Sequence, residues 1–200
     1  MRVLLVGTLP SAIDRTEAVL RSGGHEVVHC RDEHAGTFPC TALTERGSCP
    51  FEAAAVDVVV TARDRAWPRP SPFEDGAICG IHRFVPLVVH GTTVLEPFEQ
   101  WAVAETTTED ELLGAVEAAA GAPLPEHGAV AGETARDLLA TQGLPGDGTT
   151  AEVRRSGNRL VVTLGLAPDA EPYAAGITVK ILTALRSLDP YAAGIDVVRG

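Results

Sequence analysis

Four cysteines are the residues of this chain best suited to carry chemistry. Cys30, Cys40 and Cys49 fall within one segment, residues 29–49, and Cys79 follows later. This segment has neither helical nor strand periodicity, and a long irregular stretch inside a compact domain is usually functional or disordered. Disordered tracts are rich in Pro, Glu, Ser, Gln and Lys rather than in cysteine. We therefore expect the segment to have a binding role.

The expected location of the protein decides how the thiols are interpreted. The chain begins MRVLLVGTLPSAIDR, whose apolar run is too short for a secretory signal. No run approaches the ~20 apolar residues of a membrane-spanning helix. A cytoplasmic protein is therefore expected, and thiols stay reduced in that compartment. The cysteines are then metal ligands, redox-active groups or inert core thiols in preference to structural disulfides.

The spacing of the cysteines separates the metal candidates. Ligand pairs about two to four residues apart, typical of structural zinc sites, are absent. Scattered thiolates suit an iron–sulfur cluster better, and the pair Cys49–Pro50 is similar to the Cys-Pro pair of ferredoxins. We predict a metal centre that holds an iron–sulfur cluster or zinc on four ligands: Cys30, Cys40, Cys49 and Cys79.

Two histidines are candidates for additional ligands, and the other interpretations of the thiols stay open. His34 and His90 are expected near the thiols, whereas His25, His82 and His127 are expected to be exposed or half-buried polar residues. The cysteines could instead form a redox pair or be buried and unreactive. No catalytic residues are predicted, because no Ser/His/Asp arrangement and no glycine-rich phosphate loop is present.

The charge of the chain limits its partners. A formal net charge of −11 disfavours nucleic acid and anionic membranes, which a binding face must neutralise. A small basic group, Arg63, Arg65 and Arg69, is expected to be solvated on a loop. Another protein is the expected macromolecular partner.

Strand and helix patterns alternate over the first 120 residues. Continuous apolar runs such as VDVVVT are typical of strands buried on both faces of a parallel sheet. Strands are expected at 1–7, 25–29, 56–61, 86–90 and 101–105, and helices at 11–22, 71–83 and 109–120. This alternation predicts an α/β fold with a five-stranded, doubly wound parallel sheet. Ligands of such sheets gather beyond the carboxyl ends of the strands, where Cys30 and His90 stand and where the other thiols can converge.

A second, smaller domain is expected after a Pro/Gly-rich stretch, GAPLPEHG. The predicted division is a first domain at 1–121, a linker at 122–132 and a second domain at 133–200. The second domain is expected to have helices at 133–141 and 172–188 and strands at 151–155, 159–166 and 195–199. That αββαβ order predicts a small α+β domain, expected to bind another protein.

The VDVVV strand, the helix TEDELLGAVEAA and the order of elements make the first 120 residues similar to receiver domains of response regulators, which have a flavodoxin-like fold. The phosphorylation motif of receivers is absent. Thr8 and Leu9 stand in place of its acidic pair, and the phosphorylated aspartate falls at about Ala62, the switch hydroxyl at about Gly91 and the lysine at about Glu105. The resemblance therefore implies a receiver-like fold that does not accept phosphate.

The element order of the last 70 residues resembles BON-type modules, which bind surfaces or other proteins. Together these patterns predict a non-catalytic regulatory or sensory protein in signal transduction, with a metal or redox-sensing site on a receiver-like domain. Two alternatives remain: an iron–sulfur or thiol-dependent oxidoreductase, and a structural or assembly protein in which the cysteines are incidental. The sequence does not determine the oligomeric state.

Overall fold

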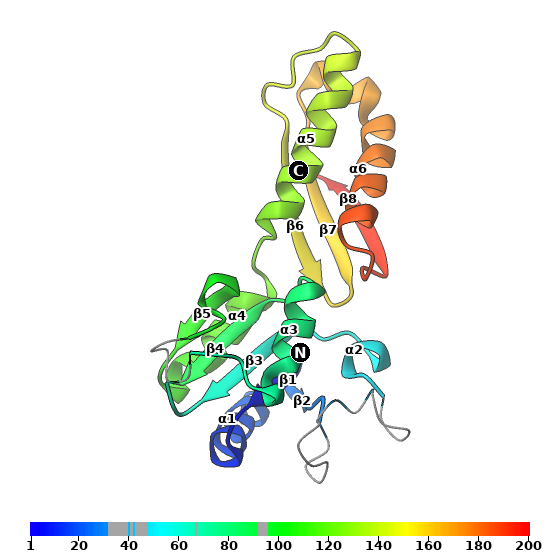
Figure 1. Ribbon diagram of the computed structural model, residues 1–200. Helices are drawn as coiled ribbons and strands as arrows, with labels where there is room; N and C mark the ends of the chain where they lie inside the picture. The colour runs from blue at the N-terminus through cyan, green and yellow to red at the C-terminus, as the bar shows by residue number, and fades with distance from the viewer. Residues whose placement is uncertain (32–39, 41, 43–47, 67, 92–95) are drawn as a thin grey trace. The chain divides into compact units, whose positions relative to one another are not determined.

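The computed structural model describes residues 1–31, 40, 42, 48–66, 68–91 and 96–200. The chain divides into two compact units, Met1–Ala122 and Pro123–Gly200 (Figure 1). Each unit has its own sheet and its own apolar core.

A five-stranded parallel sheet forms the centre of the first unit, as the sequence predicts. Its order is β2-β1-β3-β4-β5. Strand register aligns Gly7, Ala62, His90 and Thr106, so the carboxyl ends of four strands meet at one edge. The strands are β1 (Arg2–Gly7), β2 (Glu26–Val28), β3 (Val58–Arg63), β4 (Leu87–Gly91) and β5 (Ala102–Thr106).

Helices cover both faces of this sheet. Because successive strand residues point to opposite faces, the buried side chains form two apolar clusters. One contains residues of α1 and α4, and the other contains Ala77 of α3. The elements are α1 (Pro10–Ser22), α2 (Pro50–Ala53), η2 (Pro72–Glu74), α3 (Asp75–His82), η3 (Glu99–Trp101) and α4 (Glu109–Ala120).

The helix starts show where local sequence decides structure. Ser71 and Glu74 form a capping box at η2, which leads directly into α3, so the expected start at Ser71 is confirmed. By contrast, α1 begins one residue before Ser11, with Leu9 as its N-cap and Pro10 in its first turn.

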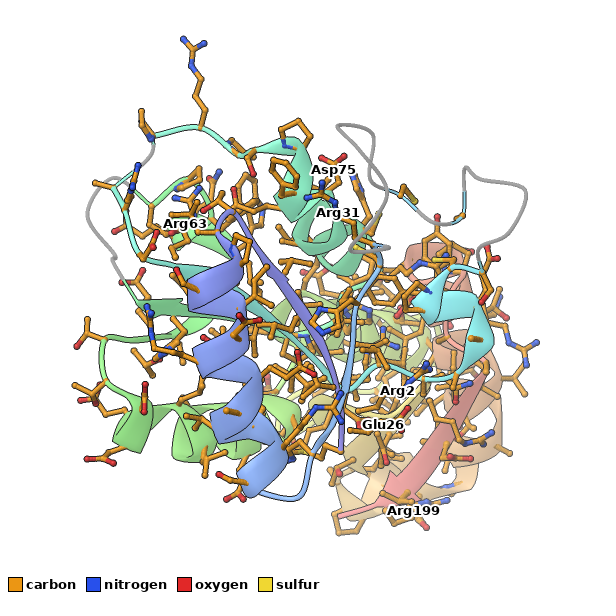
Figure 2. The ribbon with its side chains drawn as sticks, turned by 90° about the horizontal axis from the view of Figure 1, so that it is seen from below. Arg2, Glu26, Arg31, Arg63, Asp75 and Arg199 are labelled. Carbon is orange, nitrogen blue, oxygen red and sulfur yellow. The ribbon has the colours of Figure 1, made fainter. Side chains whose placement is uncertain are left out.

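Figure 2 shows Arg31, Arg63 and Asp75 at one edge of the first unit and Arg2 and Glu26 at the other.

The second unit packs two helices on a three-stranded sheet of order β6-β7-β8. A hairpin joins β6 to β7, and β8 runs parallel to β7 (Figure 1). The elements are α5 (Pro125–Thr141), β6 (Thr150–Ser156), β7 (Arg159–Gly165), η4 (Pro168–Tyr173), α6 (Ala174–Leu188) and β8 (Gly194–Arg199).

The expected linker at 122–132 is wrong over most of its length. Helix α5 begins at Pro125, eight residues before the helix expected at 133. Proline suits the first turn of a helix, since that turn needs no N–H donor and the ring fixes the helical φ. The division between the two units falls at Ala122 and Pro123.

Within the described ranges, no helix combines the length and the apolar character that crossing a membrane requires.

Candidate functional site

All four cysteines line one small cavity of the first unit. Cys30 follows β2, Cys49 is the N-cap of α2, and Cys79 belongs to α3. These segments are far apart in the sequence, and Cys40 joins them from the segment between Cys30 and Cys49. The cavity has a volume of about 30 Å³. All four residues are among those described, and all four are thiols outside any disulfide.

The alternation of side chains after β2 directs Cys30 into this cavity. Val27 packs in the cluster of α1 and α4, and His29 lies 3.1 Å from Glu17 of α1. Val28 and Cys30 point to the opposite face, where they pack with the cluster of α3. The parity of position 30 therefore places its sulfur on the face that carries Cys79.

A glycine in α3 makes room for the Cys30 sulfur. A Cβ atom at position 76 would lie 2.8 Å from Cys30 Sγ and 2.7 Å from Val6 Cγ1. Because real Cβ atoms do not approach so closely, any larger residue at Gly76 would force the helix or the thiol to move. The close contact holds α3 against the end of β2.

The cavity disfavours thiolate in the absence of a cation. Burial, together with the nearby Cys40 and Cys79, raises the pKa of Cys30 to about 11. Burial and the neighbouring thiols also raise the pKa of Cys79, although the charge of Arg83 acts in the opposite direction. Thiols in this state are protonated at neutral pH, so a metal ion would have to displace their protons on binding.

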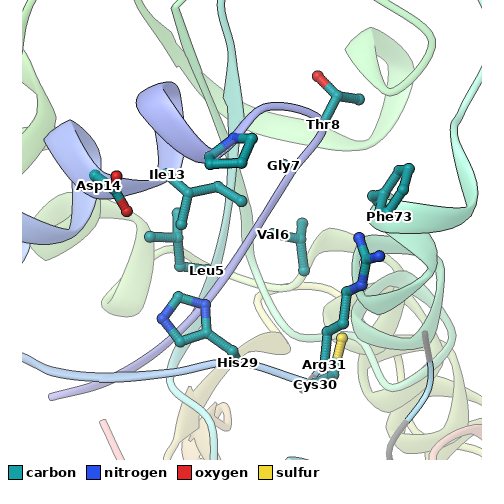
Figure 3. Close-up of a pocket in the computed structure, with 11 residues that line it drawn as sticks. Leu5, Val6, Gly7, Thr8, Ile13, Asp14, His29, Cys30, Arg31 and Phe73 are labelled. Atoms are coloured by element: carbon teal, nitrogen blue, oxygen red, sulfur yellow. The ribbon is translucent and has the colours of Figure 1, made fainter. Parts of the chain in front are cut away.

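Two phenylalanines that line the cavity are each stacked against an arginine. The Arg31 guanidinium lies 3.7 Å from the centre of the Phe73 ring (Figure 3), and that of Arg83 lies 5.2 Å from the centre of the Phe51 ring. One carboxylate, Asp75, also lines the cavity. Among the described residues, two guanidinium groups and one carboxylate therefore lie at the cavity or on the rings that line it, a balance that favours an anionic group between the thiols.

In the part of the chain that the structure describes, no three His, Cys, Asp or Glu side chains are arranged to hold a metal ion. The thiols share a cavity but are not gathered around one point. Tetrahedral zinc with Zn–S bonds of ~2.3 Å requires sulfur atoms about 3.8 Å apart. A single ion would thus require the thiols to close inward.

The two candidate histidine ligands have different outcomes. His34 lies outside the described residues. His90 is not brought to the thiol cavity: its Nδ1 lies 2.9 Å from Thr106 Oγ1, and the nearest charged groups belong to α1 and α4. Strand alternation explains this, because Val89 packs with the cluster of α3 and the next residue must point to the other face. Burial lowers the pKa of His90.

A buried ion network, which the sequence analysis missed, lies at the same edge of the sheet. Arg63, expected to be solvated, is only 3% exposed. Its Nε and Nη2 donate to the Glu74 carboxylate at 2.6 and 2.9 Å, and its Nη1 lies 3.3 Å from Glu96 Oε2. Burial raises the pKa of Glu96, which also accepts a hydrogen bond from the Phe98 backbone N–H. Glu74 immediately precedes α3, so this network anchors the helix that carries Cys79.

The second unit has a buried network of its own. Arg155 donates to Asp189 Oδ2, and His127 Nε2 lies 3.6 Å from the same oxygen. The backbone N–H groups of Tyr191 and Ala192 donate to the other carboxylate oxygen at 3.1 Å. The expectation of an exposed or half-buried His127 is therefore wrong, since the residue is 1% exposed. Burial opposes ionisation of Asp189, but His127 and Arg155 hold its pKa below the ordinary value.

Comparison with known proteins adds no assignment. No family model matches the chain, and no curated protein has a significantly similar sequence.

Proposed function

We propose that the protein is a non-catalytic regulatory or sensory protein whose first unit holds a metal centre on Cys30, Cys40, Cys49 and Cys79. One observation carries this proposal: four thiols from separated segments line a single cavity. Thiolates are the ligands that zinc and iron–sulfur clusters take in proteins. In a reduced compartment, four converging thiols have a stronger reason to share a metal than to form disulfides.

The charge around the cavity supports an anionic complex. Four thiolates around a zinc ion, or around an oxidised cluster core of the same charge, carry a net charge of about −2. An anion of this kind is stabilised by nearby cations. Arg31 lines the cavity, and Arg83 acts electrostatically on Cys79.

The raised pKa values weigh against thiol catalysis. A catalytic cysteine needs a lowered pKa, because the thiolate is the nucleophile. Cys30 and Cys79 have the opposite shift. A thiol-dependent oxidoreductase is for this reason the weaker proposal, and a centre that forms or disperses with the metal supply or redox state is the stronger one.

Two observations bear on the type of metal centre, and they favour different answers. The spacing of the cysteines, which lack the close ligand pairs of structural zinc sites, favours an iron–sulfur cluster. The small cavity, about 30 Å³, favours a single zinc ion. We place the cluster first, with zinc as the alternative.

The rest of the proposal concerns the two units. The strand order 2-1-3-4-5 is compatible with a flavodoxin-like, receiver-like fold. Position 62, where receivers carry the phosphorylated aspartate, is alanine in this chain. The next residue, Arg63, is paired with Glu74 and Glu96. Both features support a unit that does not accept phosphate. Metal binding, which would draw the thiols inward, would tighten the packing of α3 against the end of β2, and metal loss would relax it. We propose that the second unit, similar in element order to BON-type modules, conveys this change to a partner protein.

Metal analysis of the protein purified without oxygen tests the proposal. Iron, acid-labile sulfide and zinc are measured together with the visible absorption spectrum. Iron with equivalent sulfide and a broad absorption band supports a cluster, whereas about one zinc per chain without colour supports a single ion. A protein that retains no metal, and takes up none when iron and sulfide or zinc are supplied under reducing conditions, would contradict the proposal.

A further inference from the structure

The outer edge of strand β8 is open to a further strand. β8 is the terminal strand of the second sheet, and it pairs with β7 in an unbroken register from Gly194 to Arg199. Among the described residues, none makes a backbone hydrogen bond to the other side of β8. An unpaired edge of this kind is a template for pairing with another chain.

The other three edges of the two described sheets are protected in ways that β8 lacks. β2 has only three residues, and very short edge strands offer little to pair with. β5 has an irregular register with β4 and an exposed Glu105. β6 is covered, because the Leu124 N–H donates to the Val153 carbonyl at 2.7 Å and Pro123 forms a bridge with Arg154.

Both charged side chains of β8 are neutralised within the second unit. The Asp196 carboxylate accepts hydrogen bonds from Nε and Nη2 of Arg159 at 2.8 and 2.5 Å. Arg199 donates to the Glu171 carboxylate of η4. Between them, Val198 is 44% exposed. The edge therefore presents β-branched residues to solvent without an uncompensated charge to repel an incoming strand.

The ladder between β7 and β8 determines which backbone groups face the open edge. The Gly200 N–H donates to the Leu164 carbonyl, so position 200 faces β7. The N–H and C=O groups of successive residues in a strand point to opposite sides. Positions 194, 196 and 198 thus also bond to β7, whereas Ile195, Val197 and Arg199 direct their N–H and C=O groups to the open edge.

We propose that the open edge of β8 pairs with β8 of a second copy of this chain, antiparallel and about a twofold axis at Val197. In this register Val197 faces its own copy and Ile195 faces the partner's Arg199, each pair exchanging two hydrogen bonds. An axis at Asp196 would instead place two aspartates face to face, and an axis at Val198 would leave the start of the strand unpaired.

A second copy is the occupant that the edges themselves favour. Twofold pairing closes the open edges of both copies at once, and because β6 is covered, association ends at the dimer. The proposal concerns the second unit alone and does not depend on metal at the four thiols.

Sedimentation equilibrium of the full-length protein tests the proposal, with reductant present so that no disulfide-linked dimers form. A contact made by one strand is smaller than the ~1,200 Å² of stable interfaces, so we expect a weak dimer with a Kd on the order of 0.1 mM. A monomeric mass at all concentrations from about 10 µM to about 1 mM would overturn the proposal.

Amide hydrogen exchange at these two concentrations locates the contact. The N–H groups of Ile195, Val197 and Arg199 should exchange about fourfold more slowly at the higher concentration, which is the fall in the monomer fraction for that Kd. Those of Asp196 and Val198, already bonded to β7, should not change. Dimers that lack this alternation would contradict pairing through β8.

Two substitutions at one exposed position test the register. In the proposed dimer Val198 faces the partner's Asp196, so Val198→Asp brings like charges together and Val198→Lys brings opposite charges together. Because the contact occurs twice in the dimer, the Kd of Val198→Asp should exceed that of Val198→Lys by about tenfold. Val103→Asp, at a valine of β5 that is 48% exposed, is the matched control and should leave the wild-type Kd unchanged. Equal Kd values for the two Val198 variants would refute the proposed pairing.

Discussion

Among the described residues, each unit of this protein buries a charged network, and the two networks have opposite compositions. In the first unit two carboxylates, Glu74 and Glu96, share the guanidinium of Arg63. In the second unit one carboxylate, Asp189, is shared by Arg155, His127 and two backbone N–H groups. The first network thus has an excess of acid, and the second has an excess of donors.

The difference shows how buried carboxylates respond to the balance of partners. Burial alone raises the pKa of a carboxyl group, and donors lower it. Burial dominates at Glu96, whose pKa is raised, whereas the donors dominate at Asp189, whose pKa is lowered. In the second network both oxygens of the Asp189 carboxylate have donors, so the role of this network is structural. The first anchors α3 beside the cavity that the four thiols line.

Removing the charge of Asp189 should have the largest effect. Asp189→Asn leaves Arg155 buried beside a neutral amide, and breaking a buried ion pair costs about 3–5 kcal/mol. Denaturant unfolding followed by tyrosine fluorescence measures this loss, because both tyrosines, Tyr173 and Tyr191, lie in the second unit. Asp196→Asn, in an exposed pair with Arg159, is the matched control and should change stability little. An equal effect of the two substitutions would refute the comparison.

Lowering the pH should destabilise the second unit before the first. The lowered pKa of Asp189 gives stability that is present above the unfolded pKa of ~3.9 and is lost as pH falls through the folded value. The raised pKa of Glu96 has the opposite sign: its contribution is present below the unfolded pKa and is lost as pH rises through the folded value.

Thermal melting between pH 7 and pH 3 checks this difference. Tryptophan fluorescence reports the first unit, which contains both tryptophans, and tyrosine fluorescence reports the second. From these two groups we expect the tyrosine transition to shift to lower temperature first, and Asp189→Asn to remove most of that shift. A tryptophan transition that falls first, in the wild type and in Asp189→Asn alike, would contradict the assignment.

The smallest effect is expected for the same chemical change in the first unit. Glu96→Gln keeps an acceptor for the Phe98 N–H and leaves Glu74 as the counter-charge of Arg63. Because burial makes the ionised form of Glu96 costly, loss of its charge is partly offset, and the cost should stay below ~1 kcal/mol. Glu74→Gln, which removes the bidentate partner, should cost more. Tryptophan-detected unfolding of both variants measures the ratio, and a reversed ranking would show that Glu96 is the essential counter-charge.

The sequence predicts the order and type of the elements because their apolar periodicities are strong. It also predicts that the thiols stand near the carboxyl edge of the sheet. It does not predict the face to which each side chain points. His90 was expected near the thiols, but strand alternation directs it to the opposite face, and that parity depends on the register of β4.

The buried arginine was missed because β3 starts and ends later than its apolar run suggests. The strand was expected at residues 56–61 and runs from Val58 to Arg63. Asp57 lies before the strand, and its carboxylate accepts a hydrogen bond from the backbone N–H of Arg2 at 2.7 Å. A shift of two residues turns Arg63 from a loop residue into a buried strand residue, and its partners Glu74 and Glu96 are distant in the sequence.

The central claim is that the four thiols share one metal centre, and its most direct test is the metal content of single variants. Cys40→Ser and Cys79→Ser are purified without oxygen beside the wild type, with His90→Gln as the control, because His90 lies outside the thiol cavity. If one centre uses all four thiolates, both cysteine variants lose most of the metal and His90→Gln keeps it. Full metal content in Cys79→Ser would contradict a four-thiolate centre.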